Sequence, residues 1–433
     1  MKTRRIGGPV YVVDGARTPF LKARGGPGPF MASDLAVAAG RPLLARHGFS
    51  PEELDEVILG CAMPSADEAN IGRIVALRLG CGDKVPGWTV MRNCASAMQA
   101  LDSAARNIRL GESDLVLAGG TESMSRAPIL YNDDMVEWLA GLARARSPQD
   151  RAAHFLKLRP GHLKPVIGLL KGLTDPVVGL NMGETCEVIA HRFGIDRAAM
   201  DAYAARSHHR LAAAIDAGWM DEVVTVYDDR GNVYSEDDGL RRDSSVGKLA
   251  KLKPVFDRRV GKVTAGNSSQ ITDGAALLLL ASERAVESMD LPVLGRIDDT
   301  EWAALDPREM GLGPVHASTP ILVRHELSLD DVDYWEINEA FAGQVLACLA
   351  AWDDEDYCQG ELGLESALGA LDQDRLNVDG GAVSIGHPVG ASGARIVLHA
   401  LKVLERTGAE KAMATLCIGG GQGGAMLLTR GAK

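Results

Sequence analysis

Two stretches of this 433-residue chain follow the same order of elements, and this internal repeat limits the possible folds most strongly. Residues 49–60 and residues 327–338 each begin with a polar, acidic helix start and end in a short apolar run. A turn, a helical segment, a buried strand and glycines then follow, over 90–120 in the first copy and 377–421 in the second. Strands alternating with helices indicate βαβ units, so a duplicated α/β fold is predicted, with chance similarity as the alternative.

The region between the copies lacks this alternation, which suggests a separate unit. The length also exceeds the roughly 250–300 residues at which single cores stop growing. We therefore predict three parts, which are an N-terminal half (1–126 with 255–292), an inserted loop domain (127–254) and a C-terminal half (293–433).

A basic segment lies inside the predicted insert. Residues 138–173 carry seven Lys or Arg against one acid, a net charge of +6 in a chain of formal charge −12. Its apolar residues predict helical segments broken by Pro160 and Pro165. The segment could attract phosphate groups of a ligand, touch an anionic membrane surface or dock a partner subunit, or it could be a solvated, partly packed loop domain.

The overall charge and hydropathy exclude other classes of protein. A formal charge of −12 argues against general nucleic-acid binding, which needs a basic face. The first 15 residues contain no apolar stretch typical of a signal peptide, and the longest apolar run, Ala275–Ala281, is far shorter than the roughly 20 residues of a membrane span. The sequence thus predicts a soluble cytoplasmic protein.

Seven cysteines are irregularly spaced, and no Cys-x-x-Cys pair occurs. Neither a disulfide framework nor a structural zinc site is expected, and we predict no metal site. Each cysteine is then either a small buried residue or a reactive thiol.

Cys94 lies in Arg-Asn-Cys-Ala-Ser-Ala-Met, between a short β-type run and a helix-like stretch. The free N–H groups and the dipole at a helix start would favour a thiolate, which makes Cys94 a candidate nucleophile. A buried cysteine at a helix start is the alternative.

Three further motifs contain chemically useful side chains. His387 lies in a loop rich in glycine, Ser-Ile-Gly-His-Pro-Val-Gly-Ala-Ser-Gly, and imidazole is the natural base for a thiol, although a lone histidine is often structural. Cys417 precedes Ile-Gly-Gly-Gly-Gln-Gly-Gly, whose backbone N–H groups suit an oxyanion hole. Asn338 begins Asn-Glu-Ala-Phe and could be an ordinary helix N-cap.

The order of these motifs closely resembles the thiolase family. The resemblance extends from Val-Val-Asp-Gly-Ala-Arg-Thr-Pro-Phe at 12–20 to Gly-Gly-Gln-Gly-Gly-Ala-Met at 420–426, and it includes residues 119–124 and 264–269. It implies the duplicated thiolase fold, with five layers in the order αβαβα and a loop domain inserted in the first half.

The resemblance also implies a role for each candidate residue. Cys94 would be the nucleophile that becomes acylated, and His387 would accept its proton. Cys417 would exchange a proton with the α-carbon of the acetyl unit. Asn338 would hold a water that stabilises the thioester enolate together with His387, and the N–H groups of Cys94 and Gly419 would form a second oxyanion hole.

CoA is expected as a substrate, with no tightly bound cofactor. Four residues match CoA-binding positions of the family: Ser269, Met182, Phe341 and Ala265. Where many thiolases have His-Met-Gly, this chain has Asn181-Met182-Gly183, which weakens the expectation of a pantetheine contact at 181.

By this resemblance the chain cleaves 3-ketoacyl-CoA reversibly to acetyl-CoA and a shortened acyl-CoA. The alternatives are a short-chain biosynthetic acetyl-CoA acetyltransferase and an inactive CoA-binding scaffold. Related ketoacyl-ACP synthases lack the second cysteine. A homodimer or tetramer is expected, and segment 138–173 could contact a hydratase/dehydrogenase partner subunit or a membrane surface, as in fatty-acid oxidation complexes.

Overall fold

The computed structural model describes residues 7–431. Residues 1–6 and 432–433 lie outside the described part, so the prediction made for the first 15 residues falls partly outside it. Ten strands form a single hydrogen-bonded sheet, and its two halves repeat one strand order. The first half runs β4 (Gly87–Val90), β3 (Glu56–Gly60), β5 (Leu115–Ser123), β10 (Thr272–Ser282) and β1 (Val10–Arg17), with β2 (Leu21–Lys22) paired to β10. The second runs β12 (Tyr334–Ile337), β13 (Lys411–Ile418), β14 (Gln422–Arg430) and β11 (Gly295–Ala304).

The pairing directions confirm the duplication. β3 pairs in parallel with β5, and β12 pairs in parallel with β13, whereas the remaining pairs toward β1 and β11 are antiparallel. An isolated parallel bridge between Trp335 and Leu376 takes the place that β4 has in the first half. The halves meet along a short seam, where β1 pairs with β11 through Tyr11 and Val12.

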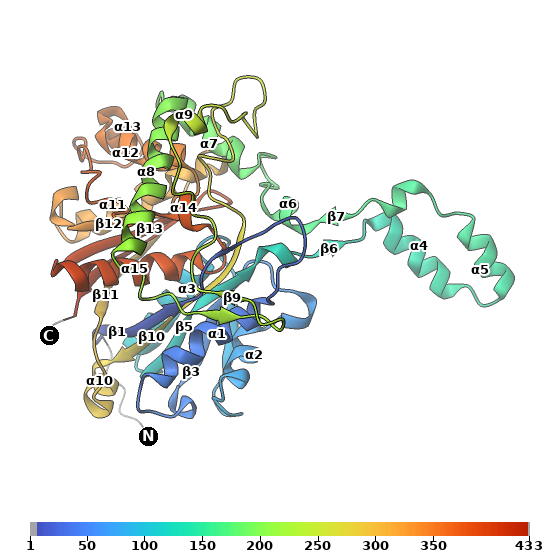
Figure 1. The fold of residues 1–433 in the computed structure, drawn as a ribbon, viewed down its shortest axis with the longest axis horizontal. Helices are drawn as coiled ribbons and strands as arrows, with labels where there is room; N and C mark the ends of the chain where they lie inside the picture. Colours follow the sequence, from blue (N-terminus) through green and yellow to red (C-terminus); the bar gives the residue numbers. More distant parts are fainter. Residues whose placement is uncertain (1–6, 432–433) are drawn as a thin grey trace.

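Helices cover the two halves of the sheet in three layers (Figure 1). α1 (Ala32–Ala45) and α2 (Ile71–Arg78) cover the first half from outside, and α11 (Gly313–Arg324) and α12 (Ala342–Asp353) cover the second. α3 (Ser96–Arg109) and α15 (Ser392–Thr407) pack against each other between the halves. Three large hydrophobic cores result, one for each helical layer, which confirms the predicted αβαβα order.

β10 shows why the strands have continuous apolar runs. Leu277 and Leu279 pack into the outer core of the first half, whereas Leu278 and Leu280 pack into the middle core. Side chains alternate between the faces of a strand, so a strand covered on both faces buries all of them. Each fully buried leucine stabilises the fold by roughly 1.5–3 kcal/mol relative to an exposed one.

The inserted region has two structurally different parts. Residues 129–167, which we call the arm, project away from the body in Figure 1; they contain β6 (Ile129–Leu130), α4 (Asp133–Arg144), α5 (Pro148–Phe155) and β7 (Val166–Ile167). α5 ends before Pro160, as expected. α6 (Gly168–Gly172), β8 (Val226–Tyr227), β9 (Val233–Tyr234) and α9 (Val246–Leu249) follow, with two longer helices among them, α7 (Met182–Arg192) and α8 (Arg197–Asp216).

α7 and α8 pack into the outer core of the second half rather than forming an independent unit. Short helices complete the body: α10 (Glu283–Met289), α13 (Glu355–Gly360) and α14 (Ala382–Ile385). Among the helices of residues 7–431, none is long and apolar enough to cross a membrane.

A buried charge network joins the two halves to the inserted segment. Arg17 on β1 pairs with Asp237 at 2.7 Å and with Glu222 at 3.2 Å. His399 on α15 lies between Glu222 and Asp379, at 3.1 and 3.2 Å. Burial alone would lower the pKa of His399, but the two carboxylates raise it to about 10. The imidazole is therefore a permanent cation at neutral pH.

Candidate active site

Cys94 lies on a turn between β4 and α3, where the sequence predicts it. Asn93 has a left-handed φ of 44°, and its side chain donates a 2.8 Å hydrogen bond to the carbonyl of Gly419. The hydroxyl of Ser96 accepts from the N–H of Arg92 and donates to the carbonyl of Asn93, at 2.9 and 2.7 Å. These bonds hold the turn and attach it to the loop that follows β13.

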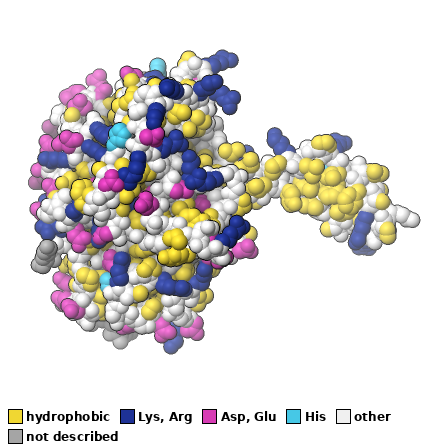
Figure 2. Space-filling view, in the orientation of Figure 1, with side chains coloured by type: hydrophobic (Ala, Val, Ile, Leu, Met, Phe, Trp, Pro, Cys, Tyr) yellow, Lys and Arg dark blue, Asp and Glu magenta, His cyan; other side chains and the backbone are white. Residues whose placement is uncertain are grey.

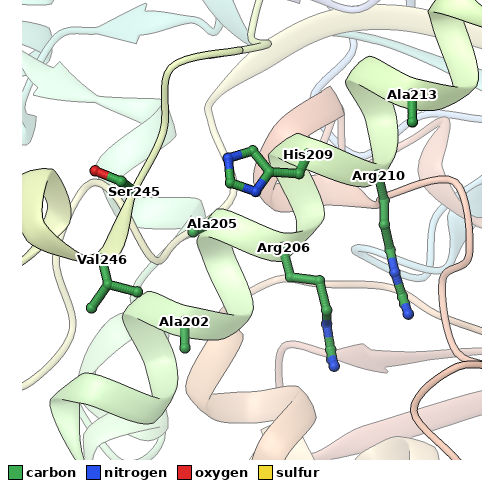
Figure 3. Close-up of a pocket in the computed structure, with 8 residues that line it drawn as sticks. All are labelled: Ala202, Ala205, Arg206, His209, Arg210, Ala213, Ser245 and Val246. Atoms are coloured by element: carbon green, nitrogen blue, oxygen red, sulfur yellow. The ribbon is translucent and has the colours of Figure 1, made fainter.

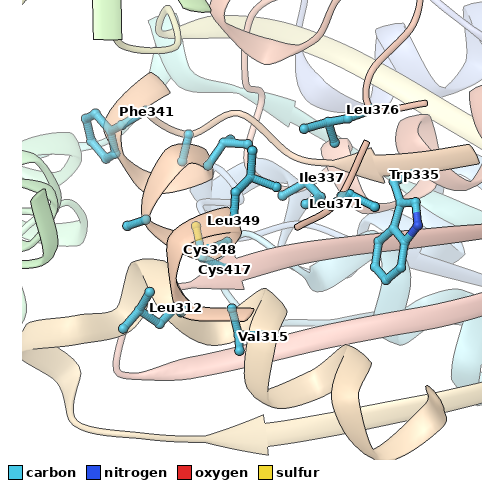
Figure 4. Close-up of a cluster of buried hydrophobic side chains, with 14 of the residues drawn as sticks. Leu312, Val315, Trp335, Ile337, Phe341, Cys348, Leu349, Leu371, Leu376 and Cys417 are labelled. Carbon is cyan, nitrogen blue, oxygen red and sulfur yellow. The ribbon is translucent and has the colours of Figure 1, made fainter. Parts of the chain in front are cut away.

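That loop brings the second cysteine to the first. The backbone N–H of Gly419 lies close enough to the sulfur of Cys94 to lower the pKa of its thiol in part. Cys417 lies two residues before Gly419, as the next-to-last residue of β13, and burial together with Cys94 raises the pKa of its thiol well above the usual value. Figure 4 shows Cys417 beside Cys348 in the buried hydrophobic cluster of the second half. The two thiols thus share one site, although they are 323 residues apart (417 − 94).

Two hydrogen bonds, one from the backbone and one from the ring, hold His387 in place. Its N–H donates to the carbonyl of Gln270 at 3.1 Å. Its Nδ1 lies 2.6 Å from the hydroxyl of Ser392, and that hydroxyl donates to the carbonyl of Pro388 at 3.0 Å. Because the hydroxyl proton of Ser392 is donated to the carbonyl of Pro388, the hydrogen bond between the ring and Ser392 must be donated by Nδ1–H of His387. The free lone pair of the neutral ring is therefore on Nε2, as a base needs.

Gly386 explains why the loop before the histidine needs a glycine. Its φ is 113°, and a Cβ there would lie 2.4 Å from the side chain of Thr272. Any other residue would be strained and would displace His387.

Asn338 completes the site from the end of β12. Its N–H donates to the carbonyl of Thr415 at 2.9 Å, two residues before Cys417. Its Nδ2 lies 3.5 Å from Nε2 of His387, and both side chains are buried. The structure therefore brings together the side chains of Asn338 and His387, and separately Cys94, Cys417 and Gly419, along adjacent ends of β12 and β13.

The predicted thiolate at Cys94 is not supported. Burial raises the pKa of this thiol, although the N–H groups of Gly419 and of Cys94 itself lower it in part. Burial, with the nearby charge of Arg395, lowers the pKa of His387 to about 3. In the unliganded site the thiol and the imidazole are both neutral. The sequence indicates a helix start at Cys94 but not the protein that encloses the sulfur, and desolvation outweighs the helix dipole here.

Of the four predicted CoA-binding residues, one lies beside the catalytic loop, two lie at the Asn-Glu-Ala-Phe turn and one is exposed. A Cβ on Gly419 would lie 3.3 Å from the sulfur of Met182, so Met182 lines the catalytic loop. The N–H of Ser269 donates to the carbonyl of Ala340, next to Phe341, at 2.9 Å. Ala265 is exposed at the start of the same 264–269 turn.

Asn181 caps the start of α7. Its Oδ1 accepts hydrogen bonds from the N–H groups of Gly183 and Glu184, both at 3.0 Å, and the carboxylate of Glu184 accepts from the N–H of Asn181. The side chain forms a capping box at the start of α7. It therefore stabilises this helix start with an amide oxygen.

A surface groove of about 580 Å³ lies elsewhere, on the outer face of α8 beside α9 (Figure 3). Arg206, His209 and Arg210 line it together with small residues of α8 and with Ser245 and Val246. None of the predicted site residues contributes to this groove. We assign the reaction to the buried site because the predicted thiols, imidazole and amide all lie around the adjacent ends of β12 and β13.

Comparisons with known proteins identify the family of the chain. Residues 10–284 match the family model described as "Thiolase, N-terminal domain", and residues 291–430 match "Thiolase, C-terminal domain". The 3-ketoacyl-CoA thiolase of Yersinia pestis (strain Pestoides F) is 36% identical over 427 residues, covering 98% of this chain and 97% of that protein. The chain belongs to the thiolase family and is an enzyme.

Solved structures of two thiolases superpose on nearly the whole chain. The acetyl-CoA acetyltransferase of Bacillus anthracis has a TM-score of 0.84 at 36% identity and covers 98% of this chain and 100% of its own. Human mitochondrial 3-ketoacyl-CoA thiolase in complex with CoA has a TM-score of 0.84 at 35% identity, with coverages of 98% and 99%. The duplicated thiolase fold is thereby confirmed.

The sequence motifs do not indicate the supporting contacts around the predicted residues His387 and Asn338. Ser392 lies in the quoted histidine motif, but no role was assigned to it. Glu339 follows Asn338 and accepts hydrogen bonds from Tyr203, Ser207 and Asn377, at 3.0, 2.7 and 2.9 Å. No local pattern indicates such contacts, because the partners come from α8 and from a distant turn.

Proposed function

We propose that this thiolase cleaves 3-ketoacyl-CoA with free CoA, giving acetyl-CoA and an acyl-CoA shortened by two carbons. Cys94 attacks the ketone carbon after His387 takes its proton. The bond between C2 and C3 breaks, and its electron pair passes to C2 as the enolate of acetyl-CoA. Cys417 protonates that carbon. The thiol of CoA then gives its proton to the Cys417 thiolate and attacks the acyl group on Cys94, and the released Cys94 thiolate recovers its proton from His387.

The observation that carries this proposal is that two neighbouring thiols and an amide–imidazole pair both lie at the adjacent ends of β12 and β13. Cleavage of a carbon–carbon bond needs a nucleophile, a site for the enolate oxygen and a proton for the leaving carbon. Cys94, the pair of Asn338 and His387, and Cys417 meet these three needs. Each oxyanion donor would contribute about 3–4 kcal/mol to transition-state stabilisation.

No hydrogen bond joins Cys94 to His387 among the residues that the structure describes. Catalytic hydrogen bonds are often long without substrate and shorten when it binds. Substrate binding would therefore precede proton transfer from Cys94 to His387. The bound thioester would also replace any solvent around the sulfur of Cys94.

Trapping of the acyl-enzyme tests the proposal. Brief incubation with acetyl-CoA, followed by acid quench and peptide mass spectrometry, should place an acetyl group on Cys94. The Cys94→Ala variant should carry none and should lose both cleavage and condensation. An adduct on another residue, or full turnover by the variant, would show that the nucleophile is wrong.

A biosynthetic role as a short-chain acetyl-CoA acetyltransferase is the second candidate. The solved structure bearing that name is as similar as the human 3-ketoacyl-CoA thiolase, with a TM-score of 0.84 in both cases. A panel of 3-ketoacyl-CoA substrates from four carbons to ten and longer separates the two. A kcat/KM that stays high with long chains supports degradation, whereas a sharp fall beyond four carbons supports the biosynthetic role.

CoA itself is proposed to enter along Met182, Phe341, Ser269 and Ala265. The first three lie beside the catalytic loop or the Asn-Glu-Ala-Phe turn, and the exposed Ala265 would mark the entrance. Replacing Met182 by Glu should raise KM for CoA while Cys94 remains reactive toward a small thiol reagent.

We also propose a dimer formed through β4. This strand is last in the strand order, and Met91 beside it is 64% exposed. An open edge with an apolar side chain suits pairing with a second copy. Light scattering should give twice the chain mass or more, and Met91→Lys should reduce it. An unchanged mass for that variant would move the interface elsewhere.

The arm is proposed to contact a hydratase/dehydrogenase partner subunit or an anionic membrane surface. Trp138 and Phe155 form a small core with rings 5.3 Å apart, but Leu156 is 89% exposed and Leu163 62% exposed. Figure 2 shows this apolar surface on the arm with Lys and Arg around it. Such a mixture binds acidic surfaces that also accept apolar side chains.

Liposome sedimentation and co-purification separate the two partners. Replacing Arg144, Arg146 and Arg151 by Ala should weaken whichever contact exists, whereas the same change at Arg242, Arg258 and Arg259 should not. No change in either assay would dismiss the proposal.

For localisation, the cytoplasm is proposed on the acidic charge and on the absence of any apolar run of membrane-spanning length in the sequence.

A further inference from the structure

Arg395 is a buried cation directly behind the amide of Asn338. It lies on α15 and is 1% exposed. One terminal nitrogen donates to the carboxylate of Glu336 at 2.8 Å, and the other donates a long hydrogen bond to Oδ1 of Asn338 at 3.5 Å. Removing a guanidinium from water costs several kcal/mol, and one ion pair often fails to offset this cost. A role beyond holding α15 to β12 would explain why the charge is kept.

The position of the two acceptors follows from strand geometry. Glu336 lies on β12, and Asn338 follows its last residue, so the two side chains are two residues apart and point to the same face. Arg395 bridges them. Glu336 satisfies one side of the guanidinium and leaves the other side for the amide.

A guanidinium has donors only, and this decides how the amide is oriented. The atom of Asn338 that faces Arg395 must be the oxygen, because the NH₂ group would be repelled. The NH₂ group then faces the other way, where it lies 3.5 Å from Nε2 of His387. Arg395 therefore selects which end of the amide points at the imidazole and into the reaction site.

The same helix holds the imidazole. Ser392 accepts from Nδ1 of His387 at 2.6 Å and precedes Arg395 by three residues on α15. Residues three apart lie on one face of a helix. The first turn of α15 thus presents one contact to each member of the Asn338–His387 pair.

We propose that Arg395 is a positioning residue for the enolate step: it fixes the Asn338 amide as a hydrogen-bond donor beside His387 and places a positive charge behind the enolate oxygen. This inference rests on the proposed thiolase mechanism. The acylation of Cys94 forms no enolate, so Arg395 should matter little for that half-reaction. The carbon–carbon step should depend on it strongly.

The decisive experiment measures the two half-reactions separately on the full-length enzyme and its variants. Exchange of labelled CoA into acetyl-CoA reports acylation of Cys94, and deuterium uptake from D₂O into the acetyl methyl group reports enolate formation. The test variant is Arg395→Met with Glu336→Gln, which removes both charges together and leaves no unpaired buried ion. A second variant, Arg395→Lys, keeps the charge with fewer donors.

The double variant should retain CoA exchange within about threefold of the unsubstituted enzyme and lose deuterium uptake by about 10²-fold, the size expected for loss of one oxyanion donor. Arg395→Lys should show a smaller loss in deuterium uptake alone. As a matched control, Arg17→Met with Asp237→Asn neutralises another buried pair and should leave the ratio of the two rates unchanged.

Equal losses in both half-reactions, or no loss in either, would overturn the inference and leave Arg395 a structural residue. A selective loss that also appears in the Arg17 and Asp237 control would overturn it as well. The proposed function fails separately, since it requires that the unsubstituted enzyme acylate Cys94 at all.

Discussion

Nδ1 of His387 lies 2.6 Å from the hydroxyl of Ser392, which itself donates to the carbonyl of Pro388. This pair of bonds fixes both the tautomer and the plane of the imidazole. The base therefore points its lone pair at the reaction site before any substrate arrives.

Replacing Ser392 by Ala should lower kcat by about tenfold to a hundredfold, because the ring would lose the bond that orients it as a base. Steady-state cleavage of acetoacetyl-CoA measures the effect. Ser318→Ala is the matched control, since Ser318 is equally buried and its hydroxyl has no hydrogen-bond partner within residues 7–431. A loss of the same size in the control would show that the hydroxyl of Ser392 has no special role.

Cys417→Ala should separate the two chemical steps. Acylation of Cys94 by acetyl-CoA should persist, whereas carbon–carbon cleavage should fall by about 10²–10⁴-fold, the usual contribution of a general acid–base group. Cys348→Ala, which removes a neighbouring buried thiol of the same cluster, should retain turnover. Full activity of the Cys417 variant would exclude Cys417 from the mechanism.

Alkylation of the free enzyme should report the raised pKa of Cys94. Because this pKa lies above the usual thiol value, the rate with iodoacetamide should rise about tenfold per pH unit from pH 7 to 9 without reaching a plateau. The other six cysteines are buried, so the label should be specific, and Cys94→Ser should abolish it. A rate that is already constant at pH 7 would show a thiolate in the resting site.

His399→Leu should lower the free energy of unfolding by about 3–5 kcal/mol, since it leaves two buried carboxylates with one charged partner fewer. The folded pKa of about 10 is above the ordinary histidine value of 6.5. The stabilisation is therefore complete below pH 6.5 and is lost as the pH rises toward 10.

Urea unfolding at pH 6 and pH 9.5 measures this dependence. The unsubstituted enzyme should lose stability between the two pH values, and the His399→Leu variant should lose less. His191→Leu, at an exposed histidine of α7, should behave like the unsubstituted enzyme. An equal pH dependence in the His399 variant would contradict the assigned charge.

The sequence predicted those parts of the site that depend on local motifs. The turn at Cys94 follows from the β-type run before it and the helix after it, and the turn at His387 follows from glycine, proline and the helix that begins after it. The duplication follows from the order of apolar runs, and β5 and β13 contain the two runs bounded by glycine.

Contacts between distant residues were not predictable in this way. Arg395 meets Asn338 only because α15 crosses β12, and no spacing in the chain indicates that crossing. Burial reversed the expected ionisation of Cys94 for the same reason, since desolvation depends on neighbours from other segments. α7 and α8 were assigned to a separate insert, yet their apolar faces pack on the second half, because packing of apolar surface does not respect sequence order.

The short seam between β1 and β11 has a consequence for the chemistry. The first copy contributes one thiol, whereas the base, the amide and the other thiol all come from the second. If the chain were divided between Met289 and Gly295, neither fragment would hold a complete reaction centre, and turnover would return only when the two pieces reassembled around α3 and α15.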